Sequence, residues 1–97
     1  MDKIKVAFVG AGYMAREHIR AFQDISVVKL AGIFSRTKAR AQKLADEFAI
    51  PLVGSSLESL YKKTHSDLLV ISVPELSVRE VCLEAFQYPW VCLIEKP

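Results

Sequence analysis

Short apolar runs alternate along the chain with segments in which apolar residues recur every three or four positions. Such runs are typical of strands, and the longer spacing is typical of helices that rest one face on a sheet. The expected strands cover residues 4–9, 27–34, 52–53, 68–71 and 91–94. The expected helices begin near residues 13, 37, 55 and 77. This alternation predicts an α/β fold with a parallel sheet.

The order of the strands follows from the handedness of their connections. Crossovers between parallel strands are almost always right-handed, so five such strands predict a Rossmann-type, doubly wound sheet in the order 3-2-1-4-5, with helices on both faces. Ligands of these folds bind beyond the carboxyl ends of the strands. Gly10, Ser35, Pro74 and Lys96 each follow an expected strand. We therefore expect these four residues to lie along one edge of the sheet.

Two serines indicate where helices begin. Ser55 is followed three residues later by Glu58, and Ser77 is followed at the same spacing by Glu80. In a capping box, the serine side chain accepts a hydrogen bond from the third helical amide while the glutamate side chain reaches back. The spacing predicts helix starts at Ser55 and Ser77.

Composition and charge narrow the class of protein. A chain of 97 residues with 52% hydrophobic residues suits one globular domain. The net charge of +2 does not favour a nucleic-acid or membrane partner. Because no apolar run approaches the roughly 18 residues that cross a bilayer and no signal-peptide pattern is seen, we expect a cytoplasmic protein. Cys82 and Cys92 lack the spacing of a metal site, so we expect two buried thiols and no metal.

The six residues from Gly10 to Ala15 connect the first strand to the first helix. Gly10 would allow a tight turn, Gly12 would let the backbone approach a pyrophosphate, and Ala15 would allow close helix packing. The anion would be held at the helix N-terminus, where Tyr13 and Met14 stand. A plain glycine turn is one alternative, and an S-adenosylmethionine site is another, although the acidic residues usual in that class are absent. We favour a dinucleotide site.

The residues after the second strand bear on the choice of cofactor. An NAD-selective site usually places an acid here, against the ribose 2′-hydroxyl, but this chain has Ser35, Arg36 and Thr37. The Arg36 guanidinium can pair with a 2′-phosphate, and the two hydroxyls can donate to it. Alternatively, Thr37 caps a helix and the basic residues are solvated, although cations at a helix N-terminus oppose its dipole. We predict a preference for NADP, with NAD as the alternative cofactor.

The motifs along the chain together resemble one family. The glycine loop, Ser35-Arg36, Val73-Pro74 after the fourth expected strand, and Glu95-Lys96-Pro97 after the fifth are similar to the N-terminal domain of the Gfo/Idh/MocA family. The likeness covers residues 1–97 as one NAD(P)-binding domain. It implies an NAD(P)-dependent oxidoreductase that transfers hydride to or from a sugar, cyclitol or related alcohol or carbonyl.

The resemblance also implies roles for the last residues. Lys96 would be the catalytic residue beside the nicotinamide, with Glu95 helping to orient it and both contributing to cofactor binding. A lysine beside a nicotinamide cation and partly desolvated has a lowered pKa, which suits a general acid or base. Family members continue into a second domain that contacts the substrate and commonly forms homo-oligomers. We therefore expect this chain to be the cofactor domain of a longer protein and inactive alone.

The chain departs from the family pattern at several positions. Many members have Thr-Pro-Asn and a histidine four residues after the proline, where this chain has Val73-Pro74-Glu75 and Val78 at the place of the histidine. The usual Ala-Gly-Lys before the last strand is replaced by Tyr88-Pro89-Trp90. The resemblance therefore assigns no nicotinamide contact to the side chains of Glu75 and Val78. A second hypothesis from a different class is a non-catalytic module that binds or senses a dinucleotide or pairs with another chain.

The remaining histidines and aromatic residues fit none of these roles. His18 falls on the polar face of the first helix and His65 in a polar loop, so we expect both to be solvated. Trp90, Tyr88 and Tyr61 are expected to be packing or interface residues.

Overall fold

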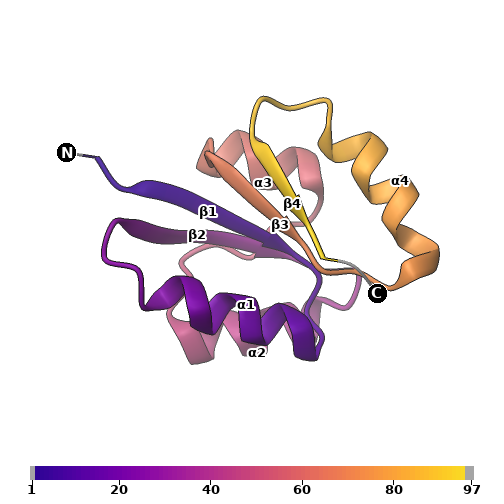
Figure 1. Cartoon of the computed structure of the whole chain (residues 1–97). Coiled ribbons are helices and arrows are strands. Elements are labelled where there is room, and N and C mark those ends of the chain that lie inside the picture. Colours follow the sequence, from indigo (N-terminus) through magenta and orange to yellow (C-terminus); the bar gives the residue numbers. More distant parts are fainter. Residues whose placement is uncertain (1, 96–97) are drawn as a thin grey trace.

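The computed structural model describes residues 2–95. Four strands and four helices follow one another in the order β1, α1, β2, α2, α3, β3, α4, β4 (Figure 1). The strands are Ile4–Val9 (β1), Val28–Phe34 (β2), Leu68–Ile71 (β3) and Val91–Ile94 (β4). The helices are Tyr13–Gln23 (α1), Lys38–Phe48 (α2), Leu57–Thr64 (α3) and Glu75–Ala85 (α4). The predicted α/β class is confirmed.

The sheet contains four parallel strands in the order β2-β1-β3-β4, so the prediction of five strands in the order 3-2-1-4-5 was wrong. Residues 52–53 lie where the extra strand was expected, beside β2, but form only an isolated bridge between Ile33 and Val53. The Ile33 N–H donates to the Leu52 carbonyl at 2.9 Å, and the Gly54 N–H donates to the Ile33 carbonyl at 2.8 Å. The segment is bracketed by Pro51, which lacks an amide donor, and by Gly54, so it is too short for a ladder.

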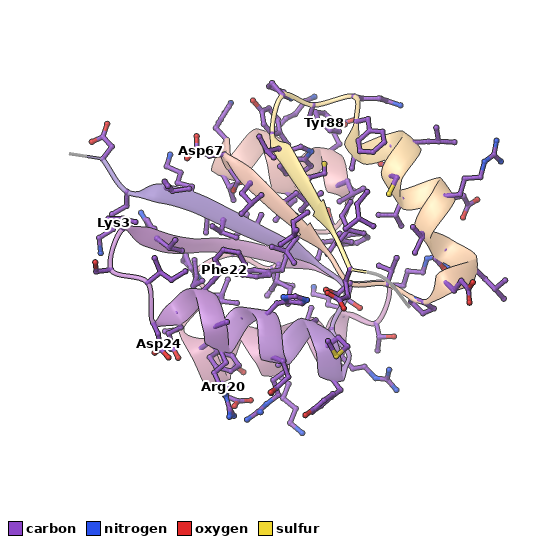
Figure 2. All side chains as sticks on the ribbon, in the orientation of Figure 1. Lys3, Arg20, Phe22, Asp24, Asp67 and Tyr88 are labelled. Carbon is purple, nitrogen blue, oxygen red and sulfur yellow. The ribbon has the colours of Figure 1, made fainter. Side chains whose placement is uncertain are left out.

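Helices cover both faces of the sheet, α1 and α2 on one face and α3 and α4 on the other (Figure 1). Each face has its own core, because successive residues of β1 point to opposite faces. Val6 and Phe8 pack on the side of α1 and α2, whereas Ala7 and Val9 pack on the side of α3 and α4. Figure 2 shows the Phe22 side chain between α1 and the sheet. Its ring packs edge-on against that of Phe8, with the two ring centroids 6.1 Å apart.

Both predicted capping boxes were wrong. The N-cap of α3 is Ser56, one residue after the predicted position, and its box partner is Ser59 rather than Glu58. Helix α4 begins at Glu75 directly after Pro74, so Ser77 lies inside the first turn. A proline before the first turn and an acid within it favour this earlier start, because the ring restricts the backbone and the carboxylate complements the helix dipole.

Three aromatic residues, one from α3 and two from the segment before β4, pack together, as predicted. The rings of Tyr61, Tyr88 and Trp90 lie with centroids 5.2 to 5.7 Å apart, and the Trp90 indole N–H donates to the Ala85 carbonyl at 2.8 Å. Through this cluster, the segment before β4 packs against α3 and α4. It lies away from the carboxyl ends of the strands, which leaves that edge of the sheet open.

Candidate functional site

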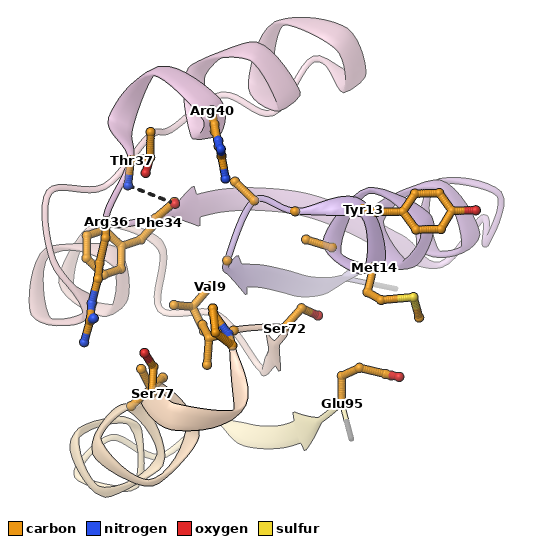
Figure 3. Close-up of a pocket in the computed structure, with 18 residues that line it drawn as sticks. Val9, Tyr13, Met14, Phe34, Arg36, Thr37, Arg40, Ser72, Ser77 and Glu95 are labelled. Carbon is orange, nitrogen blue, oxygen red and sulfur yellow. Dashed lines mark hydrogen bonds between the residues drawn. The ribbon is translucent and has the colours of Figure 1, made fainter. Parts of the chain in front are cut away.

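A cleft of about 500 Å³ lies at the carboxyl edge of the sheet, between the loop after β1, the turn after β2 and the start of α4 (Figure 3). Its lining comes from the ends of the strands and the first turns of the helices that follow them. The lining residues are Val9, Gly10, Ala11, Gly12, Tyr13, Met14, Ala15, Phe34, Ser35, Arg36, Thr37, Arg40, Ser72, Val73, Pro74, Ser77, Val81 and Glu95.

Eleven of the residues predicted from the sequence lie together around this cleft. They are Gly10, Gly12, Tyr13, Met14, Ala15, Ser35, Arg36, Thr37, Val73, Pro74 and Glu95. Lys96 lies outside the described residues. Sequence reasoning did not select Ser72, Ser77 or Val81. Ser72 could have been found as the residue directly after β3, but Ser77 and Val81 required knowing which face of α4 meets the cleft.

Gly10 joins the ends of three strands. Its φ is +107°, in the region that favours glycine, and its N–H donates to the Phe34 carbonyl at 2.9 Å. A Cβ built on Gly10 would stand 2.0 Å from the Ser72 carbonyl oxygen. No side chain can occupy this position unless the backbone shifts, so Gly10 is required for the close approach of β1 to the residue after β3.

Gly12 has a different reason to be glycine. It is the N-cap of α1, its backbone is extended, and no side chain caps the first helical turn. A Cβ on Gly12 would have no atom within 4 Å, so the space over the helix N-terminus is open. Backbone amides without intrahelical partners face such a space and favour an anion there.

The loop therefore fits a dinucleotide pyrophosphate in two independent respects, the open space over the amides of α1 and the absence of any capping side chain. A third observation lies nearby. Ser72 lines the cleft, and its hydroxyl is buried and has no hydrogen-bond partner among residues 2–95. Buried polar groups are nearly always satisfied, so an unpaired hydroxyl at this edge is consistent with a polar ligand.

The turn after β2 presents basic and hydroxyl side chains to the cleft. The Ser35 hydroxyl accepts a hydrogen bond from the Thr37 N–H at 3.1 Å, which shapes the turn. Thr37 is the N-cap of α2, but its side chain makes no capping hydrogen bond. The Arg36 and Arg40 side chains stand at this end of the cleft (Figure 3), and the Arg36 Nη2 donates to the Glu80 Oε2 at 3.3 Å.

Glu95 lines the other end of the cleft and pairs there with His18 of α1, which is not part of the lining. The His18 Nε2 and the Glu95 Oε2 lie 2.7 Å apart, and their side chains are 23% and 30% exposed. The prediction that His18 is solvated was wrong, because the fold brings the polar side of α1 against the residue that follows β4. His65 is exposed, as predicted, and ends α3 with a left-handed backbone, φ +48°.

The comparisons with known proteins agree with this geometry. The Gfo/Idh/MocA family, described as an oxidoreductase family with an NAD-binding Rossmann fold, matches residues 4–97. The chain belongs to this family. Within it, the matched part is the NAD(P)-binding domain, which confirms the resemblance found from the sequence motifs.

Individual family members are distant in sequence. The uncharacterized oxidoreductase YgjR of Escherichia coli is 27% identical over 71 residues, which are 73% of this chain and 22% of YgjR. Among solved structures, UDP-N-acetylglucosamine 3-dehydrogenase GnnA from Acidithiobacillus ferrooxidans is 29% identical, with a TM-score of 0.86 over 100% of this chain and 30% of GnnA. The chain thus spans less than a third of the length of either protein.

Two further solved structures match the fold and contain different cofactors. GenD2 from gentamicin A biosynthesis, solved with NAD, is 22% identical with a TM-score of 0.91, over 100% of this chain and 28% of GenD2. Biliverdin reductase from Synechocystis, solved with biliverdin and NADP+, is 23% identical with a TM-score of 0.84, over 97% of this chain and 29% of the reductase. These likenesses are to the fold and do not separate the two cofactors for this chain.

The thiols of this family member lie outside the cleft lining. Cys82 is buried and Cys92 is partly buried, so the expectation of two buried thiols was correct only for Cys82. Burial raises the pKa of each thiol, and the neighbouring Cys82 raises the pKa of Cys92 further. Both thiols are therefore neutral near pH 7, and the reactive thiolate form is disfavoured.

Two features are absent from the part of the chain that the structure describes. No cluster of histidine, cysteine, aspartate and glutamate side chains in that part of the chain could hold a metal ion. No helix in the same range is long and apolar enough to cross a membrane.

Proposed function

We propose that this chain binds NADP in preference to NAD, as the cofactor domain of an oxidoreductase that transfers hydride to or from a sugar, cyclitol or related alcohol or carbonyl. The observation that carries the cofactor preference is the position of Arg36. Arg36 follows β2 directly after Ser35, lines the cleft, and stands where an NAD-selective site would place an acid.

The residues of the cleft divide between two parts of the cofactor. Gly10, Gly12 and the first amides of α1 would hold the pyrophosphate, with Tyr13, Met14 and Ala15 forming the wall beside it. Ser35, Arg36 and Thr37 would surround the 2′-phosphate at one end, and Val73 and Pro74 would contact the cofactor from the end of β3. A guanidinium offers paired donors to a phosphate, whereas a neutral 2′-hydroxyl gains much less from it.

The bound nicotinamide supplies the hydride donor or acceptor of the reaction. In this proposal Lys96, the residue after Glu95, contacts the reacting oxygen of the substrate and exchanges a proton with it. The Glu95 carboxylate, bonded to His18 at 2.7 Å, anchors the backbone directly before Lys96. Proton transfer at the substrate oxygen accompanies hydride transfer at the adjacent carbon, so an ionisable group belongs at this end of the cleft.

The substrate class is proposed from the relatives. GnnA is named as a dehydrogenase of a nucleotide sugar, and its length exceeds that of the present chain more than threefold. Hydride transfer needs a substrate held against the cofactor, so we propose that a further domain supplies that contact and forms the homo-oligomer.

Titration of the chain with NADPH and NADH, followed by cofactor fluorescence or calorimetry, tests the proposal. We expect tighter binding of NADPH. The Arg36→Ala variant should weaken NADPH binding by about 10-fold or more, as charged hydrogen bonds contribute roughly 1.5–3 kcal/mol, and should leave NADH binding within about twofold.

Lys43→Ala is the matched control, since it removes a positive charge from the exposed surface of α2 outside the cleft lining. It should change neither affinity by more than about twofold. Equal losses of NADPH and NADH binding in Arg36→Ala would reject the assignment of Arg36 to the 2′-phosphate. No binding of either cofactor at millimolar concentration would reject the proposed function.

A further inference from the structure

An ion pair spans one end of the cofactor cleft. Arg36 lies in the turn after β2, and Glu80 lies on α4, 44 residues later in the chain. The Arg36 Nη2 and the Glu80 Oε2 are 3.3 Å apart. Ser77 and Val81, which flank Glu80 on α4, both line the cleft. The Glu80 carboxylate therefore stands at the rim of the cleft, opposite the turn that follows β2.

This contact involves the same guanidinium that is proposed to bind the 2′-phosphate. A phosphate monoester placed against Arg36 would carry a charge of about −1.5 to −2 and would lie close to the Glu80 carboxylate. The phosphate and the carboxylate would repel each other, and both would accept hydrogen bonds from the same guanidinium N–H groups of Arg36. The 2′-hydroxyl of NAD carries no charge and creates no such conflict.

We propose that Glu80 is a specificity-determining residue of this cleft, whose carboxylate competes with the cofactor 2′-phosphate for Arg36 and so limits the preference for NADP over NAD. The inference rests on the proposed function of Arg36. It adds a residue of α4 at the rim of the cleft, outside the turn after β2 that the motif singles out.

The expected change in NADPH affinity is small because both side chains of the ion pair are exposed to solvent. The side chains of Arg36 and Glu80 are 69% and 79% exposed, so water and salt screen the pair. Exposed ion pairs contribute about 0.2–1 kcal/mol, which corresponds to a change in affinity of up to about fivefold. Removing Glu80 should therefore produce a modest change that is specific to one cofactor.

The experiment is a double-mutant cycle on the 97-residue chain, titrated with NADPH and NADH in a buffer of low ionic strength. The four proteins are the unmodified chain, Glu80→Gln, Arg36→Ala and the double variant. We expect Glu80→Gln to raise NADPH affinity about two- to fivefold and to leave NADH affinity unchanged. In the Arg36→Ala background the gain should shrink, because the donors for which Glu80 competes are gone.

Glu84→Gln is the matched control, since Glu84 lies one turn further along α4 and the Arg36 guanidinium pairs with Glu80 and not with Glu84. It removes the same charge and should change neither affinity. Raising the salt concentration to about 0.5 M should reduce the gain in Glu80→Gln, because exposed charges are screened over a few ångströms.

The outcomes separate this inference from the proposed function. If the unmodified chain prefers NADPH and Arg36→Ala removes that preference, the proposed function stands. In that case, an unchanged or lowered NADPH affinity in Glu80→Gln overturns the competition, since a carboxylate that orients Arg36 would give a loss. An equal gain with and without Arg36 also overturns it, because that result indicates general charge repulsion. An absence of NADPH binding by the unmodified chain overturns both.

Discussion

The two glycines of the loop after β1 differ in what they contribute, although they are only two residues apart. Gly10 has φ +107° and its missing Cβ leaves room for the Ser72 carbonyl, so it serves the packing of the backbone. Gly12 has an ordinary φ of −87°, and its missing Cβ faces open space. The motif predicts a tight turn at Gly10 and a close approach to the pyrophosphate at Gly12, and the local geometry of each glycine fits that division.

Substitution by alanine should separate these roles. Gly10→Ala places a Cβ 2.0 Å from a backbone oxygen and forces a positive φ on a non-glycine residue, so we expect the free energy of unfolding to fall by about 2–4 kcal/mol. Gly12→Ala should lower it by less than about 1 kcal/mol, the usual penalty for alanine at an N-cap. Urea unfolding followed by circular dichroism measures both.

Cofactor titration of the Gly12→Ala variant completes this test. Because the added methyl group occupies the space over the amides of α1, NADPH and NADH should both bind about 10-fold or more weakly. A normally folded Gly12→Ala chain with unchanged affinity for both cofactors would contradict the assignment of this space to the pyrophosphate.

At the scale of the elements, helix starts depend on which side chain actually reaches the free amides. The motif that begins at Ser55 predicts a cap there, but the Ser56 hydroxyl accepts from the Ser59 N–H at 3.0 Å. The Ser59 hydroxyl in turn accepts from the Ser55 and Ser56 N–H groups at 3.0 and 3.3 Å. Two adjacent serines offer the same chemistry, and only the path of the chain into α3 selects between them.

The stability of α3 provides a direct test of this cap. Ser56→Ala removes the acceptor of the box and should lower the free energy of unfolding by about 0.5–2 kcal/mol. Ser55→Ala leaves its backbone N–H bonded to Ser59 and should lower it by less than about 0.5 kcal/mol. Thermal or urea unfolding of both variants measures these changes. A larger loss of unfolding free energy for Ser55→Ala than for Ser56→Ala would show that the cap lies at Ser55.

At the scale of the whole molecule, the His18 and Glu95 pair connects the beginning and the end of the described chain. His18 lies in the middle of α1, Glu95 follows β4, and 77 residues separate them. The pair lies at the cleft end where Glu95 lines the cavity, so it joins the glycine loop helix to the edge strand of the sheet.

A double-mutant cycle measures this connection. His18→Ala and Glu95→Ala should each destabilise the chain, and the double variant should lose less than the sum of the two. The coupling should be about 0.5–1.5 kcal/mol, the usual net contribution of a hydrogen bond, because both side chains are less than one third exposed. Additive losses in urea unfolding would indicate that the two side chains do not interact in solution.

Much of the fold could be predicted from the sequence, because the pattern within each element is local. The apolar run at 68–71 and the periodic stripe of α2 correspond closely to β3 and Lys38–Phe48. The prediction of a strand at residues 52–53 was wrong because these two residues, next to Pro51, form a single bridge instead of a ladder. The glycine loop, Ser35 and Arg36 could be placed at one cleft because the carboxyl ends of parallel strands share an edge.

Short spacings along the chain are enough to predict the alternation of strands and helices, the residues at the carboxyl edge of the sheet and membership of the family. Which residues meet across that edge depends on the tertiary structure. Gly10 against Ser72, His18 against Glu95 and Arg36 against Glu80 are pairs separated by 44 to 77 residues, as the numbering shows. No local pattern encodes such contacts, because they arise when the strands align and bring distant loops together.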